Sequence, residues 1–355
     1  MNLLEVLYAQ EFKKPSFYPR KFSITQKKTL ITGPKKSGKS TIIFDYLSQL
    51  KKGSFLYIDF ADLRVTQVII FGLPSFLKKN NITLLVLENF DFSFKIPDCQ
   101  EVIVTTHTAQ TLESFTTQTL YPLDFEEFIA FEKRQTNVEA IFSDYTDWGT
   151  YPAVVVLAKE NFIKYFQDHI RLMCDSPLEF TILKNYALVQ GLPVSSFALF
   201  NEIKLFHKVS KDKFYAITKK LQEEKVLFLV EKFGSPRADK KVYMIDFAMK
   251  SVLTFDKDFI TRFSNIIFLE LLKNGDEVYF TDLIDFYIPC ENKAIIAMPF
   301  LPPAMILQKL SRLEKDFAKY NIEKIEIITL ESDEETYHDN IPVEILPFWS
   351  WALQR

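Results

Sequence analysis

Eight residues near the N-terminus have the types and spacing of a phosphate-binding loop. They read Gly-Pro-Lys-Lys-Ser-Gly-Lys-Ser, a full match to G-x-x-x-x-G-K-[ST]. In such a loop the glycines turn backbone N–H groups toward phosphate oxygens, the lysine reaches the β- and γ-phosphates, and the final hydroxyl can ligate Mg²⁺. We therefore predict nucleotide binding by Gly33, Pro34, Lys35, Lys36, Ser37, Gly38, Lys39, Ser40 and Thr41.

A second chemical group follows an apolar run at 84–87. A phosphate-loop ATPase holds Mg²⁺ with an acid at a strand end, often followed by a glutamate that activates water. Glu88 stands at the metal position, with Ser40 as the other predicted metal ligand. The alternative for Glu88 is an ordinary surface carboxylate. Asn89 stands at the catalytic position, where an amide cannot accept a proton, so we expect weak general-base catalysis.

Other candidates for catalysis are less specific. Thr105 and Thr106 end another apolar run, where a polar side chain often senses the γ-phosphate, and Thr106 is our candidate. The alternative is a pair of threonines with good strand propensity. Arg64 and Arg134 are candidates for a trans-acting arginine, although a solvated surface role suits both. The chain has no obvious N-K-x-D guanine-reading motif, which favours ATP over GTP as the ligand.

The elements that must position these residues are also visible in the sequence. Residues 29–32 predict a short buried strand before the loop, and residues 40–50 predict a helix whose N-terminus faces the phosphates. Further strands are predicted at 54–60, 82–87 and 101–106, separated by helical segments. This alternation predicts an α/β domain at about 1–155, with a parallel sheet and helices on both faces.

Residues 156–255 are dominated by helical periodicity. Ser210 is a candidate N-cap for a helix over 210–224, and a strand at 226–230, a turn and a strand at 241–245 follow. This layout predicts a winged helix. Its possible DNA contacts are Lys211, Lys213, Lys219 and Lys220. The alternatives are that these lysines only solubilise the helix, or that the module binds a protein partner.

Composition restricts the function classes. The 355 residues carry a net charge of −3, so any nucleic-acid binding requires a local basic patch. Three scattered cysteines form no metal-ligand spacing and no disulfide framework. No apolar stretch is long enough for a membrane span, and the N-terminus lacks the charge order of a signal peptide. We therefore expect a cytoplasmic protein.

The last hundred residues return to mixed α/β periodicity. Helices are predicted at 260–272 and 304–320, and the acidic run 331–335 reads as a solvated loop. Strands are predicted at 277–280, 283–288, 294–297, 324–330 and 342–346.

Several further motifs resemble those of a known family, the archaeal and bacterial AAA-type ATPases with a C-terminal restriction-endonuclease-like domain of unknown function. Residues 120–128 (LYPLDFEEF) resemble its P-L-S-F-E-E-F motif, with Asp124 in place of serine. Residues 148–152 (WGTYP) resemble G-G-x-P, and residues 240–246 (KKVYMID) resemble K-x-Y-x-x-D. The resemblance covers nearly the whole chain. It implies a nucleotide-binding core, a winged helix at 156–255 and a nuclease-like domain at 256–355.

The resemblance also indicates where nuclease chemistry would lie. Such nucleases bind Mg²⁺ with a helix acid, a strand-end aspartate and an E-x-K strand, whose lysine polarises the attacking water. Ser264 replaces the helix acid, Asp285 is retained, and Ala297-Met298-Pro299 stands in place of E-x-K. A lone carboxylate holds a divalent cation poorly. We predict that this domain is degenerate and has no nuclease activity.

These observations predict an ATP-binding switch that uses ATP and Mg²⁺ and hydrolyses ATP slowly or only with a partner. One alternative is a DNA-binding factor that uses the winged helix. Another is a scaffold that keeps the fold and has lost both chemistries.

Overall fold

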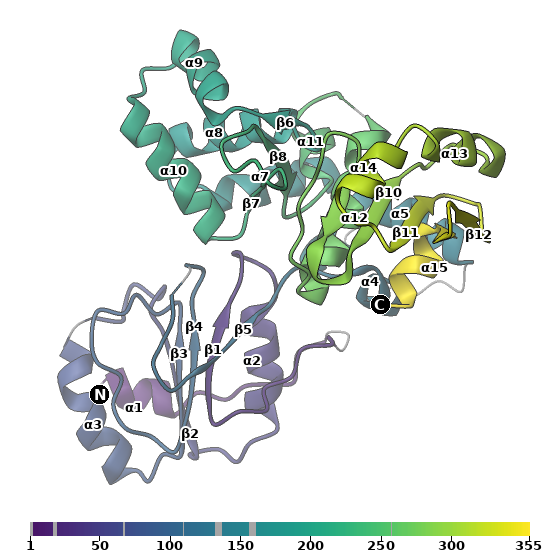
Figure 1. The fold of residues 1–355 in the computed structure, drawn as a ribbon. Coiled ribbons are helices and arrows are strands. Elements are labelled where there is room, and N and C mark those ends of the chain that lie inside the picture. The colour runs from purple at the N-terminus through teal and green to yellow at the C-terminus, as the bar shows by residue number, and fades with distance from the viewer. Residues whose placement is uncertain are drawn as a thin grey trace. The chain divides into compact units, whose positions relative to one another are not determined.

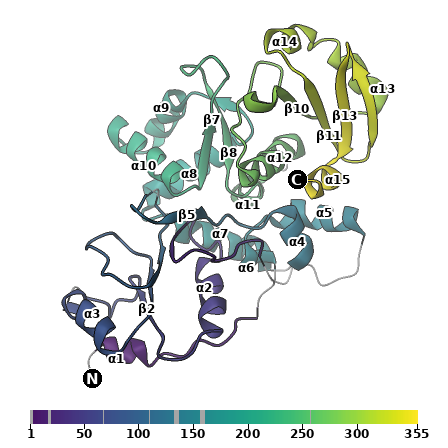
Figure 2. The same ribbon diagram turned by 60° about the horizontal axis from the view of Figure 1, so that its bottom comes forward.

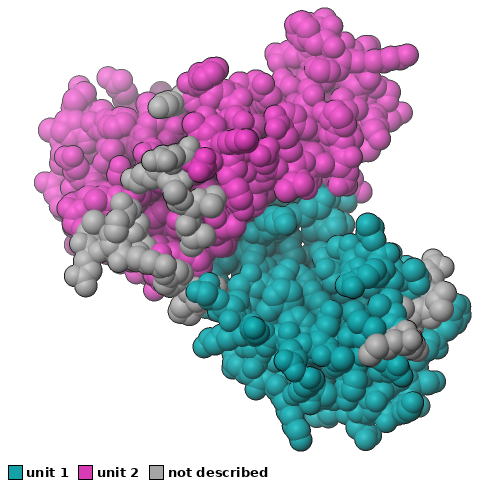
Figure 3. Space-filling model, turned by 180° about the vertical axis from the view of Figure 1, so that it is seen from behind, with its two compact units in different colours: residues 1–122, 223–225 teal, residues 123–222, 226–355 magenta. Residues whose placement is uncertain are grey.

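The chain folds into two compact units (Figure 3), one of residues 1–122 with 223–225 and one of residues 123–222 with 226–355. The computed structural model describes residues 3–16, 20–66, 68–108, 110–131, 137–155, 161–256 and 258–355. Within these ranges no helix is long and apolar enough to cross a membrane. The division of the chain into three domains at 155 and 255 stays a prediction.

Unit 1 is built on a five-stranded parallel sheet with strand order β2-β3-β4-β1-β5. The strands are β1 (Lys28–Thr32), β2 (Phe55–Asp59), β3 (Leu84–Glu88), β4 (Glu101–Thr105) and β5 (Thr116–Thr119). Strand β4 lies between β1 and β3, so the strand before the phosphate loop and the strand that ends in the acid are both neighbours of β4. This sheet confirms the predicted α/β class. Strand β5 was not predicted, because its residues Thr-Thr-Gln-Thr carry no apolar signal.

Helices cover both faces of this sheet (Figure 1). On one face α2 (Lys39–Ser48) packs Ile42, Ile43 and Leu47 against residues such as Tyr57 and Val86. On the other face lie α1 (Leu3–Tyr8) and α3 (Val68–Lys79), whose leucines pack on side chains of β1 to β4. The two apolar layers hold the carboxyl ends of the parallel strands at one edge of the sheet.

Unit 2 begins with helices and a small antiparallel sheet of order β6-β8-β7. The predicted hairpin forms: β7 pairs with β8, and Ser210 Oγ accepts a hydrogen bond from Lys213 N at the start of α10. The elements are α4 (Phe125–Phe131), α5 (Val138–Trp148), α6 (Pro152–Val155), α7 (Phe162–Met173), α8 (Pro177–Leu188), β6 (Pro193–Val194), α9 (Ser196–Phe206), α10 (Lys211–Glu223), β7 (Leu227–Val230), β8 (Lys240–Met244) and α11 (Met249–Leu253).

The rest of unit 2 is α/β with a mixed sheet of order β12-β13-β11-β10-β9. Strands β10, β11 and β13 run parallel side by side (Figure 2), and β9 and β12 are antiparallel to their neighbours. The elements are α12 (Phe259–Asn274), β9 (Phe286–Ile288), a 3₁₀ turn (Pro289–Glu291), β10 (Lys293–Ala297), α13 (Pro303–Leu310), α14 (Glu314–Lys319), β11 (Lys324–Thr329), β12 (Glu334–His338), β13 (Ile341–Pro347) and α15 (Phe348–Leu353).

Three expectations for this region were wrong in detail. The predicted strand 277–280 forms only single bridges at Tyr279 and Phe280, and the helix predicted over 304–320 is interrupted after Leu310. The acidic run does not stay a loop, because its last two residues begin β12. Asp339 and Asn340, with φ of 47° and 67°, make the tight turn into β13. This two-residue turn joins β12 to β13 in a hairpin. The hydrogen bonds of that pairing stabilise β12 although its first residues are acidic.

Candidate nucleotide-binding site

The loop between β1 and α2 has a conformation that requires its glycines. Gly33 has φ of 135°, and a Cβ on this residue would lie 2.2 Å from the carbonyl oxygen of Leu120. Gly38 has φ of 103°, which L side chains rarely adopt. The hydroxyl of Ser37 is buried and has no hydrogen-bond partner among the described residues. The loop thus has the shape and the spare polar capacity of a phosphate cradle.

Lys39 lies inside this loop. Its side chain is buried, and Nζ donates hydrogen bonds of 2.8 Å to the carbonyl oxygens of both Gly33 and Pro34. Burial lowers the pKa of Lys39 to about 8. The ammonium is held by these two loop carbonyls, and the loop leads into the N-terminus of α2, where the helix dipole favours an anion.

Ser40 and Glu88, the two predicted metal ligands, are in direct contact. Ser40 Oγ donates a hydrogen bond to Glu88 Oε1, and Tyr57 OH donates one of 2.5 Å to Glu88 Oε2. Glu88 is 2% exposed. Burial raises the pKa of Glu88, and the hydrogen bonds from Ser40 and Tyr57 offset part of that rise. A hydroxyl and a carboxylate at one point form an oxygen donor set that suits Mg²⁺.

Asn89 directly follows the acid and sits in the left-handed region, with φ of 52°. Its backbone N–H donates to Thr105 Oγ1 at 3.0 Å, and its side-chain Nδ2 donates to Asp59 Oδ1 at 2.8 Å. Thr106, the predicted sensor, instead makes a local turn, where its Oγ1 accepts from Thr108 N at 3.3 Å. Thr105 is therefore the threonine that contacts the end of β3.

The arginine candidates gain no support from the structure. Arg64 is exposed and forms an ion pair with Asp62, with Nη2 2.6 Å from the carboxylate. Arg134 lies outside the described residues.

Three further residues at this end of the sheet, Arg20, Tyr57 and Asp59, belong to no sequence motif and were not predicted as part of the site. Tyr57 and Asp59 reach Glu88 and Asn89 from the neighbouring strand β2, so only the strand register brings them there. Arg20 donates to the carbonyl oxygens of Ser37, at 3.1 Å, and Tyr121, at 2.7 Å. It ties the loop to the segment after β5. The sequence offered one signal for them, the carboxylate of Asp59 near the end of the predicted strand 54–60.

Asp285, the acid of unit 2 that was predicted to end a strand, lies directly before β9 and has partners of another kind. Lys241 Nζ donates to Asp285 Oδ1 at 2.9 Å, and the backbone N–H of Ala297 donates to Oδ2 at 3.1 Å. Ser264, at the position of the missing helix acid, lies 3.0 Å from the hydroxyl of Tyr243. The residues that would hold a nuclease metal are thus engaged in contacts with β8 and β10.

Residues of the segments 123–128, 148–152 and 240–246 take part in buried polar contacts of unit 2. Glu270 accepts hydrogen bonds from Phe125 N at 3.0 Å and Tyr145 OH at 3.1 Å. Asp246 accepts hydrogen bonds from Thr150 N and Oγ1 at 2.6 and 2.9 Å. Burial raises the pKa of both carboxyl groups. Their partners come from within the protein, so these motifs serve the fold of unit 2.

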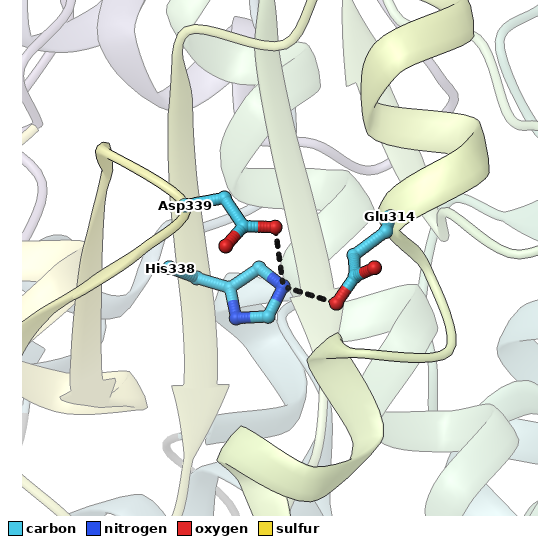
Figure 4. Close-up of side chains that lie close together, drawn as sticks. All are labelled: Glu314, His338 and Asp339. Carbon is cyan, nitrogen blue, oxygen red and sulfur yellow. Dashed lines mark ion pairs between the residues drawn. The ribbon is translucent and has the colours of Figure 1, made fainter.

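A group of possible metal ligands lies at the edge of the mixed sheet (Figure 4). His338 Nε2 is 3.4 Å from Glu314 Oε1 and 4.0 Å from Asp339 Oδ2. Both carboxylate side chains are at least half exposed, and the group offers three ligand atoms in all. This is the geometry of surface ion pairs and carries no metal assignment.

The lysines of α10 are not equivalent. Lys211, Lys213 and Lys219 are exposed. Lys220 is half-buried, and its Nζ forms ion pairs of 2.5 Å with Asp175 and 2.8 Å with Glu179. Lys220 therefore has carboxylate partners of its own and is the weakest of the four DNA-contact candidates.

Comparisons with known proteins add a relative and two distant structures. No family model matches the chain. "Uncharacterized protein MJ1544" of Methanocaldococcus jannaschii is 23% identical over 398 aligned positions, which span 93% of this chain and 89% of that protein. The Walker-type ATPase PABY2304 of Pyrococcus abyssi has a TM-score of 0.43 at 14% identity, over 63% of this chain and 90% of its own.

AMPPCP-bound DnaA from Aquifex aeolicus has a TM-score of 0.29 at 11% identity, over 63% of this chain and 87% of its own. At these TM-scores neither solved structure assigns a ligand or an activity to this chain. The functional assignment therefore depends on the geometry of the loop and of its neighbours.

Proposed function

We propose that this protein binds ATP with Mg²⁺ at residues 33–41 and acts as a nucleotide-dependent switch that hydrolyses ATP slowly or only with a partner. The observation that carries the proposal is the contact of Ser40 with Glu88 beside the buried ammonium of Lys39. Motif residues from two segments far apart in the sequence meet in the arrangement that a phosphate–metal site needs.

The residues present fit both ligands. Lys39 and the backbone N–H groups of the loop would bind the phosphates, and the orphaned Ser37 hydroxyl adds a further donor. Ser40 and Glu88 would hold Mg²⁺, which neutralises phosphate charge when bound. The absence of a guanine-reading motif favours ATP over GTP as the nucleotide.

Slow hydrolysis is supported by Asn89. An amide at the position after the acid cannot accept a proton from water, and its Nδ2 is already committed to Asp59. Bound ATP would then persist, as a switch requires.

ATP affinity and turnover test this proposal. Wild type should bind ATP with Mg²⁺ and turn it over slowly, Lys39→Ala should bind weakly, and Asn89→Glu should turn over faster than wild type. Rapid wild-type turnover would contradict the switch, and failure to bind any nucleotide would favour a scaffold instead.

For unit 2 we infer a winged helix formed by α8 to β8 and a nuclease-like domain without nuclease activity. The small antiparallel sheet with its preceding helices supports the first. The Lys241–Asp285 pair and Ala297-Met298-Pro299 at the position expected for E-x-K support the second. Incubation with plasmid DNA and Mg²⁺ or Mn²⁺ should leave the DNA intact, and cleavage that Asp285→Asn abolishes would refute this inference.

DNA binding remains the second candidate, carried by Lys211, Lys213 and Lys219 on the exposed side of α10. Binding to duplex DNA with a steep salt dependence would support it. No binding at low salt would exclude it.

A further inference from the structure

The carboxylate of Asp59 ends β2, the strand beside the one that ends in the acid. Parallel pairing places Asp59 opposite Glu88, and paired residues of parallel strands point to the same face of a sheet. Tyr57, two residues earlier, lies on the face that α2 covers and reaches Glu88. Asp59 therefore stands on the phosphate-loop face, at the carboxyl end of the sheet.

The two oxygens of Asp59 are used differently. Oδ1 accepts hydrogen bonds from Ala61 N at 2.9 Å and from Asn89 Nδ2 at 2.8 Å. Oδ2 accepts none from the residues that the structure describes, and the side chain is half-buried. A carboxylate that is held by one oxygen and open at the other is arranged to accept a proton.

Asn89 is itself held in place by the strand ends. Its backbone adopts φ of 52°, and its N–H donates to the buried Thr105. Because a carboxylate only accepts hydrogen bonds, the amide must present Nδ2 to Asp59. The contact thus joins an amide on β3 to a carboxylate on β2, whereas a glutamate after the acid would place the carboxylate on β3.

We propose that Asp59 is the general base of ATP hydrolysis in this protein and that Asn89 positions it. This rests on the proposed function. The water oxygen forms a bond to the γ-phosphorus, the bond to the β–γ bridging oxygen breaks, and its electron pair leaves with ADP. Asp59 Oδ2 takes the proton that the water loses and later releases it to phosphate or solvent. An aspartate on the neighbouring strand is a partial replacement for the missing glutamate, which agrees with slow turnover.

Asp59→Asn tests the assignment, because it keeps the size of the side chain and removes the proton acceptor. ATPγS affinity should stay within about twofold of wild type, whereas ATP turnover should fall about 100-fold, the lower range for loss of a general base. Trapping of ADP with aluminium fluoride, which reports on the transition state without turnover, should weaken in parallel. Thermal melting checks that the variant is folded.

The exchange Asp59→Asn with Asn89→Asp moves the carboxylate to β3 and the amide to β2. It should turn over ATP faster than Asp59→Asn alone, because the pair is restored with a base in it. Asp62→Asn is the matched control: this half-buried loop carboxylate pairs with Arg64, and its loss should leave turnover unchanged.

The outcomes separate the two proposals. If wild type does not bind ATPγS, the proposed function is wrong and this inference fails with it. Normal binding with equal turnover in Asp59→Asn and wild type would overturn the role of Asp59 alone. Wild-type turnover no higher than that of Lys39→Ala would also overturn it.

Discussion

Glu88 in unit 1 and Asp285 in unit 2 are the two acids that the sequence places at metal positions, Glu88 as the last residue of β3 and Asp285 directly before β9. Glu88 contacts two hydroxyl groups, those of Ser40 and Tyr57. Asp285 contacts the ammonium of Lys241 and a backbone N–H. The hydroxyl of Ser40 and the carboxylate of Glu88 could both ligate the same cation. At Asp285 the ammonium of Lys241 already supplies the positive charge that a metal ion would bring. The partners of an acid therefore decide its chemistry more than its place in a motif.

The largest expected effect lies in unit 1. Lys39→Ala removes the buried ammonium that we propose to bind the phosphates, and ATP affinity should fall at least about 30-fold, the lower range for truncating a buried charged contact. Isothermal titration with ATPγS and Mg²⁺ measures this. Lys241→Ala is the matched control in unit 2, and a similar loss of affinity there would break the comparison.

On the proposed function, Glu88→Gln should weaken Mg²⁺ binding by about 10-fold to 100-fold in the nucleotide complex, since a neutral amide replaces the carboxylate that would orient the metal shell. Affinity for ATPγS in EDTA should change little. A titration of Mg²⁺ at fixed nucleotide gives the apparent metal affinity, and equal values for variant and wild type would remove Glu88 from the metal site.

Asp285→Ala should instead lower the free energy of unfolding by about 1–3 kcal/mol, because it leaves the ammonium of Lys241 buried without its partner. This loss is smaller than that for a fully buried pair because Asp285 is 31% exposed, so water screens its charge. Urea unfolding measures the change. The double variant Lys241→Met with Asp285→Ala should recover part of it, and an equal or greater loss in the double variant would show that the pair is not the cause.

The smallest effect is on pH dependence. The pKa of Lys39 is lowered to about 8 by burial, so the free loop loses its ammonium above that pH. ATPγS affinity should be flat below about pH 8 and fall above it by at most about tenfold per pH unit. Lys39→Met should bind weakly without this slope. A wild-type profile that stays flat to pH 9.5 would contradict the role of the ammonium.

The sequence alone predicted the parts of the site that are contiguous in the chain. Residues 33–40 match a loop motif, and the apolar runs around it specify strands that alternate with helices, so the parallel sheet and the place of Glu88 followed. The capping role of Ser210 and the β7–β8 hairpin were also predicted, because both depend on short-range turn and cap chemistry.

Contacts between strands could not be predicted in this way. The hydrogen bond of Asn89 to Asp59 depends on the register of β2 against β3, and Lys241 meets Asp285 across 44 positions of sequence. Neither pair has a fixed spacing that a motif could record. The sensor role of Thr106 stays a prediction; β4 ends at Thr105, and the hydroxyl of Thr105 is the one that accepts the N–H of Asn89.

Metal binding in the presence of nucleotide tests the central claim most directly. Electron paramagnetic resonance can count Mn²⁺ bound to the protein with ATPγS in wild type, Ser40→Ala, Glu88→Gln and Asp285→Asn. We predict one bound Mn²⁺ that is weakened in Ser40→Ala and Glu88→Gln and unchanged in Asp285→Asn. Loss of the ion in Asp285→Asn with retention in Glu88→Gln would contradict the account.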